Sequence, residues 1–256
     1  MYKKFLILNF REAVMSRPKL LFSGLFVSLR IGVLLVAYSY ACRYTGKTNI
    51  INATVWSMAV YHVLLSFHIR GVCQTIQNEM RNGSLETTLV RPLNYPLWKA
   101  MEQLGINLPP ALIALCILPL WLTHIVAIPS LSWVGWLGLA LLSGGGVIAS
   151  AMLILSVGLL AAWMEDVVSV YWMVDKSVMV LGGSYLPVFL MPTWMQNLAS
   201  WSPMGAPMLA TQAFRTDFLA RLPFLLISQA IWISLGFCFL AWLNTQMRRK
   251  ISIHGG

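Results

Sequence analysis

Charged residues are scarce in this sequence: they make up 10% of its 256 residues, and only eight of them are acidic. A soluble domain has about a quarter of its residues charged and relies on polar groups at its surface. With 58% apolar residues and a mean hydropathy of +0.73, this chain has too few polar groups for such a surface. We therefore expect lipid to be the solvent for most of it.

Alternation of apolar and polar residues is also missing. Only helices and closed barrels cross a bilayer, because no water satisfies backbone polar groups there. Barrel strands alternate over about 10 residues, whereas the apolar runs of this chain are long and continuous. The sequence therefore predicts an all-α polytopic integral membrane protein, with residues 1–256 forming a single transmembrane domain.

Motifs for nucleotide and metal chemistry are absent as well. The sequence contains no GxxxxGK[ST] loop for phosphates and no HExxH zinc motif, and its four cysteines form no CxxC pair. His62 and His68 lie six residues apart, on different faces of a helix. We therefore expect no metal site, no catalytic residue and no cofactor bound by this chain itself, which argues against an enzyme.

The basic residues, which give a net charge of +10, cluster at the ends of apolar runs. There they are topology signals rather than nucleic-acid contacts. One side of the membrane collects Lys3, Lys4, Arg11, Arg17, Lys19, Arg81, Arg91, Lys99, Arg248, Arg249 and Lys250, and the other collects Arg43, Lys47, Arg215 and Arg221. This bias predicts that both termini are cytoplasmic.

Six apolar runs are long enough, or nearly so, to cross the bilayer, which takes about 20 helical residues. The predicted spans are residues 20–41, 54–76, 104–127, 133 to the acidic pair at 165–166, 177–190, and 223–243. The fifth is short, so part of 167–175 is expected inside the membrane too. Asp175 and Lys176 would then neutralise each other.

Two further segments are predicted to lie at the membrane surfaces. Residues 1–19 are basic and place Leu6, Phe10 and Val14 on one helical face, which is typical of an interfacial helix. Residues 187–222 are apolar at first but broken by prolines, which favours a re-entrant segment followed by an outer loop.

Few ionisable residues lie inside the predicted spans. Arg30 is near the middle of the first span, where a charge costs about 3 kcal/mol or more, so it either lines a substrate path or satisfies itself at a helix interface. No carboxylate sits at the centre of a well-defined span, which argues against an ion-coupled secondary transporter. That class stays the alternative, with Asp175 or Glu165 as its coupling group.

The polar segment 77–99 has local order that a simple linker does not need. Asn82-Gly83 is a turn signal, Ser84 can cap a helix over 85–90, and Pro92 ends that helix. We expect the segment to expose Glu79, Arg81, Glu86 and Arg91 on the cytoplasmic surface. A capped turn that merely links two spans remains an equal interpretation of these residues.

The same segment resembles the first cytoplasmic loop of the type-2 ABC transporter permeases. A subgroup of that family carries a pattern close to I-R-x-G-x-L-[DE]-x-x-L-[LV]-R-P-L, and residues 80–93 read Met-Arg-Asn-Gly-Ser-Leu-Glu-Thr-Thr-Leu-Val-Arg-Pro-Leu. The family also shows a glycine, prolines and a tryptophan after the fifth span. The matching residues here are Gly183, Pro187, Pro192, Trp194 and Pro203.

The resemblance implies the membrane-spanning permease of an ABC exporter in the bacterial cytoplasmic (inner) membrane. Two permease chains, identical or homologous, would form the path through the lipid, and separate ATPase subunits would bind ATP and Mg²⁺. The implied ATPase-coupling residues are Glu79, Arg81, Gly83, Ser84, Leu85, Glu86, Arg91 and Pro92, in a coupling helix. The residues matched after the fifth span would shape the outer gate.

Overall fold

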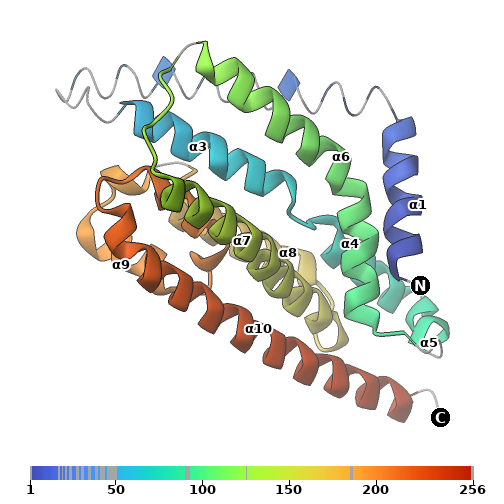
Figure 1. Cartoon of the computed structure of the whole chain (residues 1–256). Coiled ribbons are helices and arrows are strands. Elements are labelled where there is room, and N and C mark those ends of the chain that lie inside the picture. The colour runs from blue at the N-terminus through green and yellow to red at the C-terminus, as the bar shows by residue number, and fades with distance from the viewer. Residues whose placement is uncertain are drawn as a thin grey trace.

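The computed structural model describes residues 2–16, scattered positions between 18 and 44, and residues 51–89, 93–124, 126–184 and 187–254, without the side chains of 86, 87, 189 and 252–254. The predicted first span and Arg30 lie outside the continuously described part. Within the described part the fold is helical throughout (Figure 1), which confirms the all-α class.

The α-helices are α1 (Tyr2–Met15), α3 (Ile51–Ser66), α4 (Gly71–Arg81), α5 (Ser84–Leu89), α6 (Tyr95–Thr123), α7 (Trp133–Leu159), α8 (Val167–Leu181), α9 (Thr193–Trp201) and α10 (Phe218–His254). The described residues also form the short 3-10 helices η2 (Leu160–Ala162), η3 (Val188–Leu190) and η4 (Ala206–Phe214).

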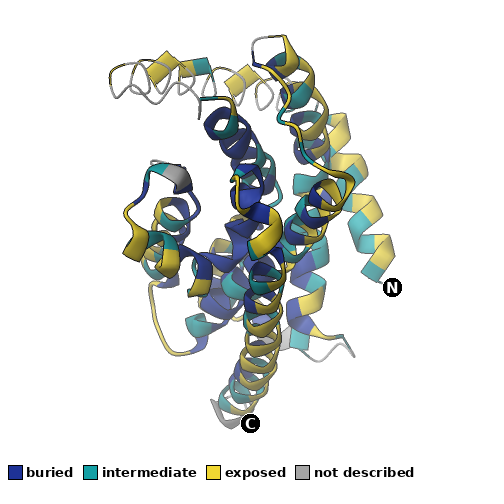
Figure 2. Ribbon diagram, turned by 60° about the vertical axis from the view of Figure 1, so that its left-hand side comes forward, coloured by how far each residue is buried: buried dark blue, intermediate teal, exposed yellow. Residues whose placement is uncertain are grey.

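Among the described residues, three helices are long and apolar enough to cross a membrane: Tyr95–Thr123, Trp133–Ala162 and Phe218–Ile251. They correspond to the third, fourth and sixth predicted spans. Helices α6 and α10 are largely exposed (Figure 2), whereas α7 is more deeply buried. The exposed side chains of α10 include Ile227, Leu235, Phe237 and Trp242. Such a surface suits lipid and agrees with a membrane protein.

The predicted second span is not one continuous helix. Helix α3 ends at Ser66 and α4 begins at Gly71. In the break, the His68 carbonyl accepts a 2.6 Å hydrogen bond from Asn107 Nδ2 of α6. The Asn107 amide thus bonds a carbonyl at the point where the regular helical hydrogen bonds are interrupted.

Two other helices begin before the spans that were predicted for them. Helix α6 begins at Tyr95 instead of 104, because the Asn94 side chain accepts from Leu97 N–H and caps it. Helix α8 occupies Val167–Leu181 instead of 177–190. Its start is set by Asp166, whose carboxylate accepts from the Ser169 amide, and it ends at Gly182.

Segment 187–222 folds into η3, α9, η4 and the start of α10. Every residue of η4 is buried, and it packs between α7, α3 and α10. The close approach to α7 needs a glycine, since a Cβ at Gly146 would lie 2.4 Å from the Pro207 carbonyl oxygen. The segment is therefore an integral part of the core, and its predicted re-entrant course in the membrane stays a prediction.

Both ends of the chain contact the connection that follows α5. The Asn94 amide donates to the Tyr2 hydroxyl of α1 at 2.8 Å, and Arg248 Nη2 of α10 donates to the Leu93 carbonyl at 2.9 Å. Helix α1 then runs alongside α6 (Figure 1). The termini and α5 thus share one end of the molecule, while α9 lies at the other.

Candidate functional site

The predicted turn at Asn82-Gly83 is present. The Asn82 N–H bonds to the Asn78 carbonyl at the end of α4, and Gly83 has a φ of 67°. A Cβ at Gly83 would meet no atom within 4 Å, so the position demands glycine for its backbone conformation rather than for space. The turn lets α5 begin at once with Ser84, where the sequence predicts a short helix.

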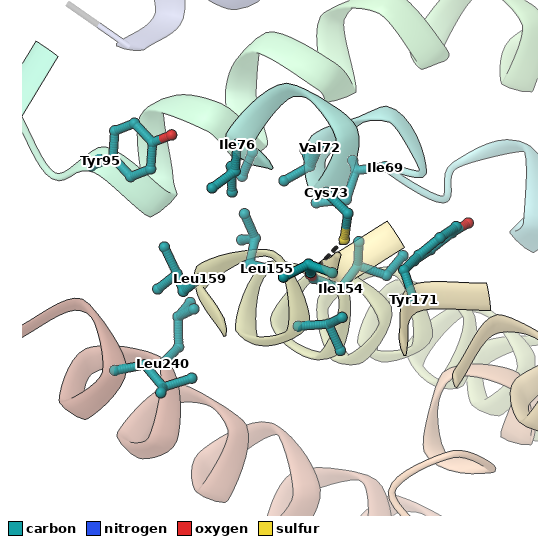
Figure 3. Close-up of a cluster of buried hydrophobic side chains, with 14 of the residues drawn as sticks. Ile69, Val72, Cys73, Ile76, Tyr95, Ile154, Leu155, Leu159, Tyr171 and Leu240 are labelled. Carbon is teal, nitrogen blue, oxygen red and sulfur yellow. Dashed lines mark hydrogen bonds between the residues drawn. The ribbon is translucent and has the colours of Figure 1, made fainter. Parts of the chain in front are cut away.

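Leu85 anchors α5 to the body of the protein. Its side chain is 1% exposed and belongs to a cluster that includes Ile76 of α4, Tyr95 of α6 and Leu159 of α7. Figure 3 shows how the side chains of these neighbours gather around α7, with Cys73 Sγ donating to the Ile154 carbonyl at 3.4 Å. Leu85 therefore packs α5 into the same cluster as residues of α4, α6 and α7.

Glu79 does not project into solvent, contrary to the sequence expectation. Its carboxylate accepts from Lys99 Nζ and, at 2.7 Å, from the Tyr95 hydroxyl, both on α6. Lys99 also lies 3.1 Å from Glu102 and 4.4 Å from the Trp98 ring centroid. Because the Lys99 side chain is 3% exposed, a pair that brings α4 and α6 together is buried at this end of the molecule.

Helix α4 is also bonded to the start of α8. The Gln77 side-chain oxygen accepts from the Val167 and Val168 amides at 2.9 and 3.1 Å, so it caps amides that have no partner within α8. Exposed Arg81 donates to the Glu165 carbonyl at 2.8 Å. Helix α4 thus holds the connection between α7 and α8.

Asp166 completes this capping. The Ser169 hydroxyl, which donates to the Asp166 carboxylate, holds the pKa of that carboxyl below its usual value. Glu165 and Asp166 are both exposed on the connection between α7 and α8. Glu165 therefore does not occupy the buried position expected of the coupling group in an ion-coupled carrier.

Three of the predicted coupling residues, Glu86, Arg91 and Pro92, lie wholly or partly outside the described residues. The backbone of Glu86 lies within α5, and its side chain is outside the described set. Arg91 and Pro92 also lie outside the described residues.

The residues predicted for an outer gate occupy the other end of the molecule (Figure 1). Gly183 follows α8 with a φ of 89°, and Pro187 is buried next to η3. Pro192 precedes α9, where Trp194 is 66% exposed. Pro203 lines an apolar cavity of about 500 Å³ between α7, α8 and α10. Gly183 and Pro187 are buried, Pro203 is partly buried, and only Pro192 and Trp194 are exposed.

Asp175 has a partner different from the one predicted. It is 3% exposed, its Oδ1 lies 3.9 Å from Arg70 Nε, and it accepts from the Tyr171 hydroxyl at 3.3 Å. Lys176 instead faces Trp172, 5.2 Å from the ring centroid. The i to i+1 neighbours point to different sides of α8, which is why adjacency in sequence does not produce a pair.

A family model of ABC-2 family transporter proteins matches residues 47–202. The chain belongs to the ABC-2 transporter family. The match includes the Asn82-Gly83 turn, α5 and the segment up to α9, and it confirms the resemblance to type-2 ABC permeases. Neither the curated proteins nor the solved structures contain a match to this chain.

In this ABC-2 family chain, sequence reasoning missed the inward-facing residues of the candidate site. Gln77 and Lys99 are polar, yet they are 5% and 2% exposed. A signal was available for Lys99, which stands beside aromatic residues at the start of a long apolar run. Nothing near Gln77 in the sequence indicates the α8 amides that it binds, 90 residues away. In the described residues, no group of three His, Cys, Asp or Glu side chains could hold a metal.

Proposed function

We propose that this chain is the permease subunit of an ATP-driven exporter and that the Asn82-Gly83 turn with α5 contacts a separate ATPase subunit. One observation carries the proposal. The short surface helix that matches the family pattern is anchored by Leu85 and continuous with α4, which is bonded to α6 and to the start of α8. A linker between two membrane helices needs none of these bonds.

The contacts of α4 support a mechanical route through the protein. A force on α5 would act through Leu85 on the common core and through the turn on α4. Helix α4 would carry the Glu79–Lys99 pair and the Gln77 cap with it, and so shift α6 and α8 together. At its far end α8 leads through Gly183 to the buried Pro187, where an outer gate would open.

We further infer the assembly that the family resemblance implies. Two permease chains, identical or homologous, would surround a central path within the lipid, and ATP and Mg²⁺ would be bound by two ATPase subunits and not by this chain. Export as the direction, the bacterial cytoplasmic membrane as the location, and a place for Arg30 on the path belong to this proposal. Cytoplasmic termini are supported by Tyr2 and Arg248, which contact the connection after α5.

An ion-coupled secondary transporter is the second candidate, and buried Asp175 is the observation that favours it. The nearby Arg70 guanidinium already compensates the Asp175 charge, which weakens that reading. Transport that persists after ATP depletion and collapses with the proton gradient would support the carrier and contradict the exporter.

Site-specific photo-crosslinking tests the proposed ATPase contact. A photoreactive residue at exposed Ser84, in cells that express the chain from its own operon context, should crosslink to a subunit that contains a Walker motif. The matched control is exposed Thr193, at the other end of the molecule. Absence of an ATPase adduct at 84, or equal adducts at 84 and 193, would overturn the proposed contact.

A further inference from the structure

A small space lies where the break between α3 and α4 meets α7 and α8. Its polar lining comes from His68 in the break, Ser150 of α7, and Tyr171 and Asp175 of α8. The remaining wall is formed by apolar side chains of α7 and α8 and by Pro207. The space available to the centre of a water-sized sphere is about 10 Å³, which is about what one water molecule needs.

Several polar atoms at this space are buried without a hydrogen-bond partner among the described residues. They are both ring nitrogens of His68, the Ser150 hydroxyl oxygen and Asp175 Oδ2. The three residues are 5%, 3% and 3% exposed, so bulk solvent does not reach them in this state. A buried polar group that lacks a hydrogen-bond partner destabilises the folded chain.

We propose that this cavity binds one structural water molecule that joins His68, Ser150 and Asp175. The hydrogen-bonding capacities match. A water molecule offers two donors and two acceptor sites, and the cavity presents three groups that one water can reach together: Asp175 Oδ2 as an acceptor, the Ser150 hydroxyl as a donor, and one of the two imidazole nitrogens of His68. A buried water typically makes about three such bonds.

The charges around the cavity favour a neutral occupant over a cation. Asp175 Oδ1 already lies 3.9 Å from Arg70 Nε and accepts from the Tyr171 hydroxyl. A bound cation such as sodium beside the Asp175–Arg70 pair would add an uncompensated positive charge in a poorly hydrated region. The imidazole is also a poor ligand for sodium, which prefers oxygen.

The bound water would give the break a specific structural role. His68 lies at the entrance to α4, Ser150 on α7 and Asp175 on α8, and no hydrogen bond directly links these three side chains in the described structure. One water would therefore connect α7 and α8 to the point where the α3–α4 helix is interrupted. The site stands whether or not the chain couples to an ATPase.

Hydroxyl-radical footprinting of the full chain in nanodiscs, read by mass spectrometry, tests the water site. Radicals formed from a bound water oxidise the side chains beside it. His68 should be modified several-fold faster than His62, which is equally buried at 3% exposed but does not line the cavity.

The substitution Ser150→Val, which fills the cavity and removes the donor, should reduce the His68 rate toward that of His62, with thermal melting as the check of folding. Replacing sodium by choline should leave the His68 rate unchanged. Equal rates for His68 and His62 in the unmodified chain would overturn the water site, and this comparison needs no variant. An unchanged His68 rate in folded S150V, or a rate that depends on sodium, would overturn it as well.

Discussion

Lys99 of α6 and Glu79 of α4 form an ion pair in which the lysine side chain is only 3% exposed. A second carboxylate, that of Glu102, lies on the same face of α6 and also pairs with Lys99. The pair joins the helix that leads into the candidate coupling turn, α4, to the helix that follows α5, which is α6.

Replacing Lys99 by methionine should destabilise the protein by about 3 kcal/mol, because two half-buried carboxylates lose their counter-charge. The triple substitution K99M, E79Q and E102Q should recover much of that loss, since no charge then remains unpaired. Thermal unfolding in detergent measures both. A K99M variant with unchanged unfolding would show that water already screens the pair.

Gly83→Ala should weaken the turn by about 1 kcal/mol, because alanine is strained at a φ of 67°. Gly144→Ala is the matched control, since a Cβ at Gly144 also meets no atom within 4 Å but lies in regular α7. Hydrogen exchange of the α5 amides should accelerate in G83A alone. Equal effects of the two substitutions would mean that the turn is not held in this conformation.

Gln77→Leu should loosen the start of α8, because the Val167 and Val168 amides lose their acceptor at a cost of about 1–3 kcal/mol. Gln74→Leu, on the exposed side of the same helix, is the control. Amide exchange at 167 and 168 should rise in Q77L while exchange in the middle of α10 stays constant. Exchange that rises everywhere would indicate global unfolding instead.

Acid should release the first turn of α8. The Asp166 carboxyl has its pKa lowered by the Ser169 hydroxyl, so its contribution is fully present above the pKa of the unfolded chain and disappears as the pH falls through the lower folded value. Exchange at the Ser169 amide, corrected for intrinsic rates, should rise below about pH 4. Asp166→Asn should remove this pH dependence, and a step that persists in D166N would assign it to another group.

Glu86→Arg should leave membrane insertion and the melting temperature intact and uncouple ATP hydrolysis from transport, because it reverses a charge on the helix proposed to contact the ATPase. The measurement is ATP hydrolysis by the purified complex in nanodiscs, with transport followed in proteoliposomes once a substrate is known. Glu12→Arg, an exposed reversal of charge on α1, is the control. Normal coupling in an intact E86R complex would contradict the coupling-helix assignment.

Local chemistry explains what could be predicted. The Asn82-Gly83 turn and the helix that follows it depend on neighbours within a few residues, and both were found where predicted. The third, fourth and sixth spans were recognised because a helix that faces lipid needs apolar residues along its whole length, and such a run is visible in the sequence. The dense pattern at 80–93 likewise carried the family resemblance.

Predictions failed where a distant residue decides the structure. The break after Ser66 involves Asn107, which bonds the His68 carbonyl from 39 positions away. Glu79 turns inward because Lys99 and Tyr95 come to lie beside it, and Asp175 faces Arg70 instead of its neighbour Lys176.

The sequence by itself determined that the chain is helical and apolar enough for a membrane, because composition acts along the whole chain. The pattern at 80–93 gave its resemblance to the type-2 ABC permeases. Only the tertiary structure decided which polar groups are buried and with whom they pair. A buried charge or amide is stable solely when a partner is brought within hydrogen-bonding distance. For Gln77, Glu79 and Asp175 those partners lie on other helices or a turn away, which packing alone selects.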